Sequence, residues 1–107
     1  MYQLLLRIAV PQFKRDETFA VLQGLIGPTE ATKGCRGCRV FRDGDAIAYW
    51  VIWDERSDME AHFRSERFRQ LLPYIELSTE PPLVEVSSLT PVGGMEWIVS
   101  AINSQPE

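Results

Sequence analysis

The chain has 107 residues, of which 45% are hydrophobic and 24% are charged, a composition typical of one small globular domain and not of a disordered or fibrous protein. Eleven basic residues against fifteen acidic ones give a formal net charge of -4, and the sequence has no basic run of the kind that binds nucleic acid. It has no apolar run long enough to cross a membrane, and Arg7 and Pro11 interrupt the apolar start where a secretory signal would continue. We therefore expect a cytoplasmic protein with no membrane or nucleic-acid partner.

The first third of the chain predicts a strand followed by a helical region. Apolar side chains alternate from Tyr2 to Val10, which is typical of a strand, and Pro11 ends it. Residues 16–26 carry apolar side chains at helical spacing, and Gly27-Pro28 breaks that helix. Gly34 suits the left-handed end of the helical region.

The middle of the chain predicts a β-hairpin. Residues 37–43 and 46–53 are both predicted as strands, and Asp43-Gly44-Asp45 has the composition of the tight turn between them. The second strand is apolar on both of its faces. One face carries Ile47, Tyr49, Val51 and Trp53, and the other carries Ala46, Ala48, Trp50 and Ile52. A strand of this kind is usually buried on both sides.

A second helical region and a last strand complete the predicted domain. Ser57 and Glu60 fit a capping box at the start of this region, and Ser65 is placed to cap a continuation that Pro73 bends. Residues 83–90 predict the fourth strand. The resulting order, β-α-β-β-α-β, predicts an α+β fold of the ferredoxin-like type, with a four-stranded antiparallel sheet and both helical regions on one face.

The other face of that sheet predicts a partner. Helices can cover only one face, so an isolated domain would leave a patch around Trp50 and Ile52 in water, and a homodimer with the sheets face to face is the simplest way to bury it. Arg7 lies on the same face and needs a carboxylate partner, for which we expect Glu85. We divide the chain into a domain of residues 1–92 and a C-terminal tail of residues 93–107. The tail is apolar, and we expect it to pack, with the neighbouring subunit as one place for it.

The two cysteines predict neither a metal centre nor a redox site. Cys35 and Cys38 are spaced as C-x-x-C, but two thiols do not complete a zinc site, and the only histidine, His62, is distant in the sequence. A strand follows Cys38, so its thiol lacks the helix N-terminus that activates redox cysteines. We expect a loop cysteine and a buried strand cysteine, and no metal or other cofactor.

Several segments taken together resemble one known family. They are Lys33-Gly34-Cys35, Arg39-Val40-Phe41-Arg42-Asp43, Trp53, Met59-Glu60-Ala61-His62-Phe63, Ser65, Phe68 and Pro81-Pro82. From Met1 to about Thr90 the chain resembles the antibiotic biosynthesis monooxygenase domain. The resemblance implies a dimeric α+β barrel built from ferredoxin-like subunits. The family includes small oxygenases that oxidise quinols, anthrones and related phenolic rings with dioxygen, often without a metal or flavin, and many of its members have no established activity.

This resemblance and the residue types together point to a site for oxidising a phenolic ring. The anion of an electron-rich phenol can itself reduce dioxygen, so the protein must supply a base and an apolar pocket that excludes water. We predict His62 as the catalytic base, because its side chain changes charge near neutral pH. Tyr49, Trp53 and Phe63 are the predicted substrate-binding side chains. The alternative is a structural role for each of them, such as a hydrogen bond from His62 to a backbone carbonyl.

The sequence departs from the haem-degrading and anthrone-oxidising members of the family. Those members use an asparagine in the pocket, whereas the only asparagine here is Asn103 in the tail, and Leu6 occupies the matching strand position. The haem-degrading members also need a histidine where this chain has Leu72 and Pro73. We therefore do not expect haem degradation. Three interpretations stay open: a cofactor-independent monooxygenase of a quinol, anthrone or other phenolic ring, a non-catalytic dimer that binds an aromatic metabolite, and a structural homodimer with no ligand site.

Overall fold

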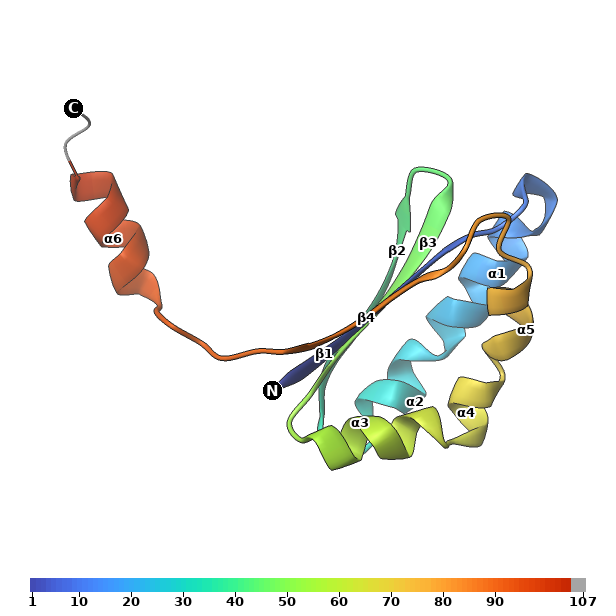
Figure 1. Cartoon of the computed structure of the whole chain (residues 1–107), viewed down its shortest axis with the longest axis horizontal. Coiled ribbons are helices and arrows are strands. Elements are labelled where there is room, and N and C mark those ends of the chain that lie inside the picture. Colours follow the sequence, from blue (N-terminus) through green and yellow to red (C-terminus); the bar gives the residue numbers. More distant parts are fainter. Residues whose placement is uncertain (105–107) are drawn as a thin grey trace.

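The computed structural model describes residues 1–104, which form a four-stranded sheet with helices packed against it (Figure 1). The elements are β1 (Tyr2–Ala9), α1 (Gln12–Gly24), α2 (Ile26–Glu30), β2 (Cys35–Asp43), β3 (Ala46–Trp53), α3 (Arg56–Phe63), α4 (Glu66–Arg69), α5 (Leu72–Glu76), β4 (Leu83–Ser88) and α6 (Met95–Asn103). The first predicted helical region consists of α1 and α2, and the second consists of α3, α4 and α5. The predicted order of strands and helical regions is confirmed.

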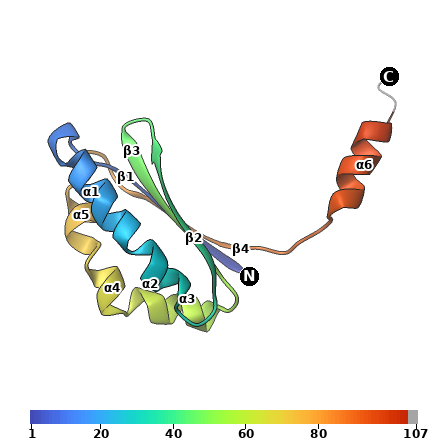
Figure 2. The same ribbon diagram turned by 180° about the vertical axis from the view of Figure 1, so that it is seen from behind.

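The sheet is antiparallel throughout, with its strands in the order β2-β3-β1-β4. Tyr2 at the start of β1 lies opposite Trp53 of β3 and Ser88 of β4. Helices α1 to α5 all lie on one side of the sheet, as Figures 1 and 2 show from opposite directions. The ferredoxin-like α+β fold is therefore confirmed. β2 and β4 form the edges of the sheet, and β2 has a bulge between Cys35 and Gly37.

The helix starts differ in part from the sequence prediction. α1 begins at Gln12, directly after Pro11, which is the N-cap residue and has an extended backbone with a ψ of 144°. The predicted capping box at Ser57 is wrong, since α3 begins one residue earlier and no side chain caps it. Glu60 pairs instead with Arg56, one turn before it, at 2.7 Å. The predicted cap at Ser65 is confirmed, because its hydroxyl accepts the Phe68 amide hydrogen at 3.1 Å.

The helix-covered face of the sheet carries the core. Because side chains alternate along a strand, every second residue of β1 and β3 points at the helices. These residues are at most 3% exposed: Leu4, Leu6, Ile8, Ile47, Tyr49, Val51 and Trp53. Burial of one such side chain contributes about 1.5–3 kcal/mol, so this layer is a major source of the stability of the domain.

The opposite face has no helix over it, and its residues are buried by other means. Ala46 and Ala48 are short enough to be covered by their neighbours on the sheet. Trp50 is half-buried, and its indole N–H donates to Gln3 Oε1 at 2.8 Å. Gln3 is the β1 partner of Ile52, so this contact brings the indole across Ile52, which is only 8% exposed. The expectation that both Trp50 and Ile52 would lie in water is therefore wrong for Ile52.

Arg7, on this same face, pairs with Asp43 and not with Glu85. Its Nε lies 2.8 Å from Asp43 Oδ2. Arg7 is opposite Ala48 in the β1–β3 register, and Asp43 is opposite Ala46 in the β2–β3 register. The two alanine methyl groups leave room for the arginine to reach across β3 to β2. The prediction of Glu85 as the partner of Arg7 was wrong, because the space above the alanines exists only where β3 lies between β1 and β2.

Helix α6 lies apart from the rest of the chain. It follows an extended run of residues that continues from β4, and it lies on the side of the sheet away from α1 to α5 (Figure 2). All nine of its residues are exposed, although most are apolar. The radius of gyration is 16.8 Å, against about 13 Å for a compact domain of this length, because of this arm. Within residues 1–104, no helix is both long and apolar enough to span a membrane.

Candidate functional site

His62 lies in the layer between α3 and the sheet and is 2% exposed. It follows Met59 by three residues, so both side chains lie on the face of α3 that packs on the sheet. The residues it meets there come from the covered face of β3. Its ring centroid is 4.9 Å from that of Trp53 and 6.3 Å from that of Tyr49. The structure thus brings three of the predicted site residues into one cluster.

A hydrogen bond joins His62 to Tyr49 inside this cluster. The Tyr49 hydroxyl oxygen lies 3.0 Å from His62 Nε2, and 3.5 Å from the hydroxyl of the buried Thr29. This partner differs from the backbone carbonyl considered as a structural alternative. The other ring nitrogen, Nδ1, is buried and has no hydrogen-bond partner within residues 1–104. An unpartnered buried polar atom costs about 1–3 kcal/mol, so its presence in a folded core is a feature to explain.

Both partners of this hydrogen bond are uncharged at neutral pH. Burial lowers the pKa of His62 to about 4, and the nearby positive charge of Arg67 acts in the same direction. Burial also raises the pKa of the Tyr49 hydroxyl. The imidazole is therefore neutral at pH 7, and one of its ring nitrogens has an unprotonated lone pair. The same effect raises the pKa of the Cys38 thiol to about 12, which agrees with a buried strand cysteine of low reactivity.

An apolar cleft of about 300 Å³ opens between the helices and the β1–β4 side of the sheet. Its lining consists of apolar side chains: Leu4, Leu6, Phe63, Phe68, Ile75, Val84 and Val86. Of the predicted site residues, Phe63 alone is part of this lining. The His62 ring centroid is 5.4 Å from that of Phe68 and 6.5 Å from that of Phe63, so the imidazole lies behind these two rings.

Phe68, Val84 and Val86 were not among the predicted site residues. Phe68 is held by the Ser65 cap, which sets the direction of the short helix α4. Val84 and Val86 are opposite Leu6 and Leu4 in the β1–β4 register. They remain exposed because the helices do not extend over this edge of the sheet. In the sequence, the alternation of apolar residues in β4 could have placed Val84 and Val86 on one face of the sheet. This alternation does not show which strand lies at the edge.

No cluster of three or more His, Cys, Asp or Glu side chains able to hold a metal ion is present within residues 1–104. The hydrogen-bonded His62–Tyr49 pair lies next to Phe68, one of the phenyl rings that line the cleft. The arrangement can thus hold a flat apolar molecule against Phe63 and Phe68. It can also accept a proton at a neutral imidazole if a ligand reaches that depth.

Solved structures from other organisms share this architecture. Rv0793 from Mycobacterium tuberculosis is 24% identical with a TM-score of 0.74, over 87% of this chain and 96% of that protein. A protein from Deinococcus radiodurans that is named for the antibiotic biosynthesis monooxygenases is 12% identical with a TM-score of 0.78, over 88% and 97%. PA3566 from Pseudomonas aeruginosa is 16% identical with a TM-score of 0.72, over 84% and 94%. At these identities the likeness shows a common fold.

The family assignment comes from the sequence. No protein with a curated description matches the chain. The sequence profile of the antibiotic biosynthesis monooxygenases matches residues 1–73, which is more than half of the chain and includes β1 to β3, α3, α4 and the first residues of α5. This chain therefore belongs to the antibiotic biosynthesis monooxygenase family.

Proposed function

We propose that the protein is a monooxygenase that oxidises a quinol, an anthrone or another phenolic ring with dioxygen, without a cofactor. Family membership supports this proposal. The observation that carries it is the apolar cleft with two phenyl rings in its wall and a neutral imidazole directly behind them. A volume of about 300 Å³ is at the small end of ligand sites and suits a molecule of one or two fused rings.

The ring itself supplies the electrons in the proposed reaction. Removal of a phenolic proton from a quinol gives an anion that transfers electrons to dioxygen. One oxygen atom then bonds to a ring carbon, and the other leaves as water with two hydrogens from the quinol. The product is the hydroxyquinone. An apolar cleft favours this course, because it keeps bulk water away from the reactive anion.

We propose His62 as the base that accepts the phenolic proton, at Nδ1. Nε2 then carries a hydrogen and donates it to the Tyr49 oxygen, 3.0 Å away, and the Tyr49 hydroxyl donates to Thr29. The ring of Phe68 lies between His62 and the cleft, so the substrate reaches the imidazole when this ring rotates aside. Tyr49 and Trp53 orient the imidazole in this proposal, and Phe63 contacts the substrate.

Oxygen consumption with a panel of quinols and anthrones tests the proposal. We expect turnover above the blank, and a loss of about 100-fold or more in His62→Gln, which keeps a hydrogen-bonding group beside Tyr49 but has no basic nitrogen. Lys14→Gln, on α1 and outside the lining of the cleft, is the control and should retain full activity. Absence of turnover with every substrate, or full activity of a folded His62→Gln protein, would reject the proposal.

A second candidate function is binding of an aromatic metabolite without turnover. The observation that favours it is the lining of the cleft, which presents apolar side chains alone. This candidate predicts that a bound aromatic molecule raises the melting temperature while no product forms and no oxygen is consumed. A pocket filled by side chains would have supported the third interpretation, a purely structural homodimer. The cleft does not give that support.

We also propose that the working unit is a homodimer joined through the face of the sheet that carries Trp50. The support is the set of apolar side chains on that face, which includes Phe41 and Leu83 beside the half-buried Trp50. Sedimentation should show a dimer at micromolar concentration. Trp50→Glu should weaken association by about 100-fold, since a charge would be buried in the interface. A parent protein that sediments as a monomer would refute this proposal.

The same proposal places α6 on the second copy. α6 leaves the sheet on the open side, where the second copy would lie, and none of its apolar residues is buried in its own chain (Figures 1 and 2). A chain that ends at Val92 should therefore dimerise about tenfold more weakly or worse, with an unchanged circular dichroism spectrum of the domain. Equal association of the two chains would contradict this placement of α6.

A further inference from the structure

The basic side chains of this protein fall into two groups. Seven of the eleven lie within 4.0 Å of a carboxylate. The other four have no such partner within residues 1–104: Lys33, Arg64, Arg67 and Arg69. Arg67 and Arg69 are on α4, and Arg64 lies two residues before that helix. Lys33 lies in the loop before β2.

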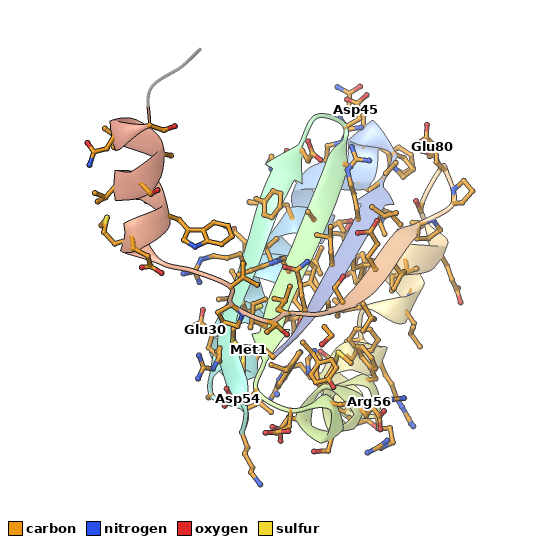
Figure 3. All side chains as sticks on the ribbon, turned by 60° about the vertical axis from the view of Figure 1, so that its left-hand side comes forward. Met1, Glu30, Asp45, Asp54, Arg56 and Glu80 are labelled. Atoms are coloured by element: carbon orange, nitrogen blue, oxygen red, sulfur yellow. The ribbon has the colours of Figure 1, made fainter. Side chains whose placement is uncertain are left out.

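Two of these four cations line a common cavity. It has a volume of about 360 Å³ and lies between α3, α4 and the loop before β2. Eight residues line it, and all but Ala61 have a polar side chain: Thr32, Lys33, Ser57, Asp58, Ala61, His62, Ser65 and Arg67. It is at the end of the sheet marked by Asp54 and Arg56, opposite the hairpin tip at Asp45 (Figure 3). It shares no lining residue with the apolar cleft.

The walls of this cavity are fixed by contacts within the fold. Gly34 has a φ of 83°, a backbone conformation that favours glycine, and the Asp58 side chain packs directly against its backbone. Arg67 donates from one terminal nitrogen to the Thr32 hydroxyl at 3.2 Å. This bond orients the guanidinium, whose remaining N–H groups are free for a ligand. The cavity is therefore held in shape from both sides.

His62 provides an independent sign of a ligand at this place. It is part of the cavity wall, it is 2% exposed, and its Nδ1 has no hydrogen-bond partner within the described chain. Nε2 is already used by Tyr49. Nδ1 is also the nitrogen proposed above as the base, so with Nε2–H donating to Tyr49 it has a lone pair and needs a donor. A water molecule bound together with the anion in this cavity can donate that hydrogen bond.

We propose that this cavity binds a small oxyanion, a carboxylate or a phosphate group with a single negative charge. Arg67 and Lys33 contribute two positive charges and Asp58 one negative charge, so a single negative charge on the ligand balances the site. The planar guanidinium of Arg67 can donate two parallel hydrogen bonds to the oxygens of an anion. The ammonium group of Lys33 can donate a further one from a flexible side chain. The inference goes beyond the proposed oxidation and does not depend on it.

Anion binding here would also act on His62. The positive charge of Arg67 is one of the causes that lower the pKa of His62, after burial. A bound anion offsets that charge, so the pKa of His62 should rise when the site is filled. Because the chain has one histidine, its imidazole signals in an NMR spectrum belong to one residue and report this change directly.

The test is a titration of the full-length ¹⁵N-labelled protein with inorganic phosphate and, separately, with acetate. Sodium chloride holds the ionic strength at about 0.15 M throughout, which makes chloride the non-oxyanion background. We expect saturable shifts of the His62 imidazole signals and a rise in the pKa of His62. A response to both anions identifies a general oxyanion site, and a response to phosphate alone identifies a phosphate site. The proposal fails if neither anion gives a saturable response.

Two arginine variants separate a site from general charge attraction. Arg67→Gln should weaken binding about tenfold or more, because it removes a charged donor from the cavity. Arg69→Gln is the matched control, since Arg69 is also unpaired and on α4 but does not line the cavity, and it should change affinity by less than about twofold. Equal effects of the two changes would overturn the proposal. If Arg67→Gln does not fold, Lys33→Gln takes its place, because Lys33 is exposed and its replacement should not disturb the fold. Unchanged anion affinity in Lys33→Gln would then overturn the proposal.

Discussion

The two faces of the sheet use the same four strands but are protected from water in different ways. On the covered face, large side chains of β1 and β3 are buried under helices, and Trp53 is fully enclosed. On the open face, burial comes from small alanines, from one indole that lies along the strand, and from an arginine that reaches across it. Both solutions bury β3 on both sides. The first depends on packing that the chain completes by itself, whereas the second leaves large side chains such as Trp50 half covered.

The sharpest way to test this contrast is to remove one tryptophan from each face. Trp53→Ala should lower the free energy of unfolding by about 3–5 kcal/mol, because it leaves a cavity in a closed core. Trp50→Ala should cost about 1–2 kcal/mol, because half of that side chain already contacts water. Urea denaturation at several protein concentrations measures both losses and separates them from any effect on association. Equal losses for the two variants would remove the distinction between the faces.

The next effect concerns His62, the one histidine of the chain, which is buried under the covered face. The pKa of His62 is about 4 in the folded chain and 6.5 in the unfolded chain. The unfolded chain therefore binds the proton first as the pH falls. Stability from this residue is therefore complete above pH 6.5 and is lost between pH 6.5 and about 4. At about 1.4 kcal/mol per pKa unit the loss is about 3 kcal/mol. Unfolding measured against pH should show this extra slope in the parent protein.

His62→Gln provides the comparison for that slope. Glutamine does not titrate, so the difference in unfolding free energy between the two proteins should shrink as the pH falls from 7 to 4. The two proteins have the same carboxylates, so the contributions of these groups to the pH dependence cancel in the difference. Parallel curves would mean that the imidazole is not held neutral by the fold.

The smallest expected effect belongs to the ion pair on the open face. Arg7 and Asp43 are both about half exposed, so their coupling should be about 0.5 kcal/mol. A double-mutant cycle with Arg7→Ala and Asp43→Ala measures it. The same cycle with Glu85→Ala should give no coupling to Arg7, since Glu85 lies opposite Leu5. A larger coupling to Glu85 would show that the arginine changes partner in solution.

Much of the fold could be predicted from the sequence because the strand pattern is strong. Alternation along residues 2–10 and the unbroken apolar run along residues 46–53 predicted two strands, which lie at the centre of the sheet, and Asp43-Gly44-Asp45 predicted the hairpin turn. Gly44 indeed has a left-handed φ of 61°. Helix ends were less predictable, since Arg56 and Glu60 formed an ion pair where a capping box was expected. The partner of Arg7 depends on strand neighbours that are far apart in the sequence.

The candidate site was less predictable than the fold. His62, Tyr49 and Trp53 meet because helix and strand periodicity both point them into the same layer. The sequence could not show that Phe68 separates the imidazole from the apolar cleft, because that depends on where α4 begins. It also could not show that Lys33 and Arg67 share a cavity, since this depends on how the loop before β2 packs against α4, where Arg67 bonds to Thr32.

The bulge in β2 has a consequence for how this protein behaves at high concentration. An unpaired edge strand can recruit an edge from another molecule and start a growing stack. β2 resists such stacking, since the bulge between Cys35 and Gly37 in its pairing with β3 bends the strand. It also carries three arginine side chains, Arg36, Arg39 and Arg42, each held in an ion pair that a second strand would have to accommodate. β4 has neither feature and has Glu85 as its one charged residue. Fibrous aggregation of this chain, where it occurs, should therefore grow from the β4 edge.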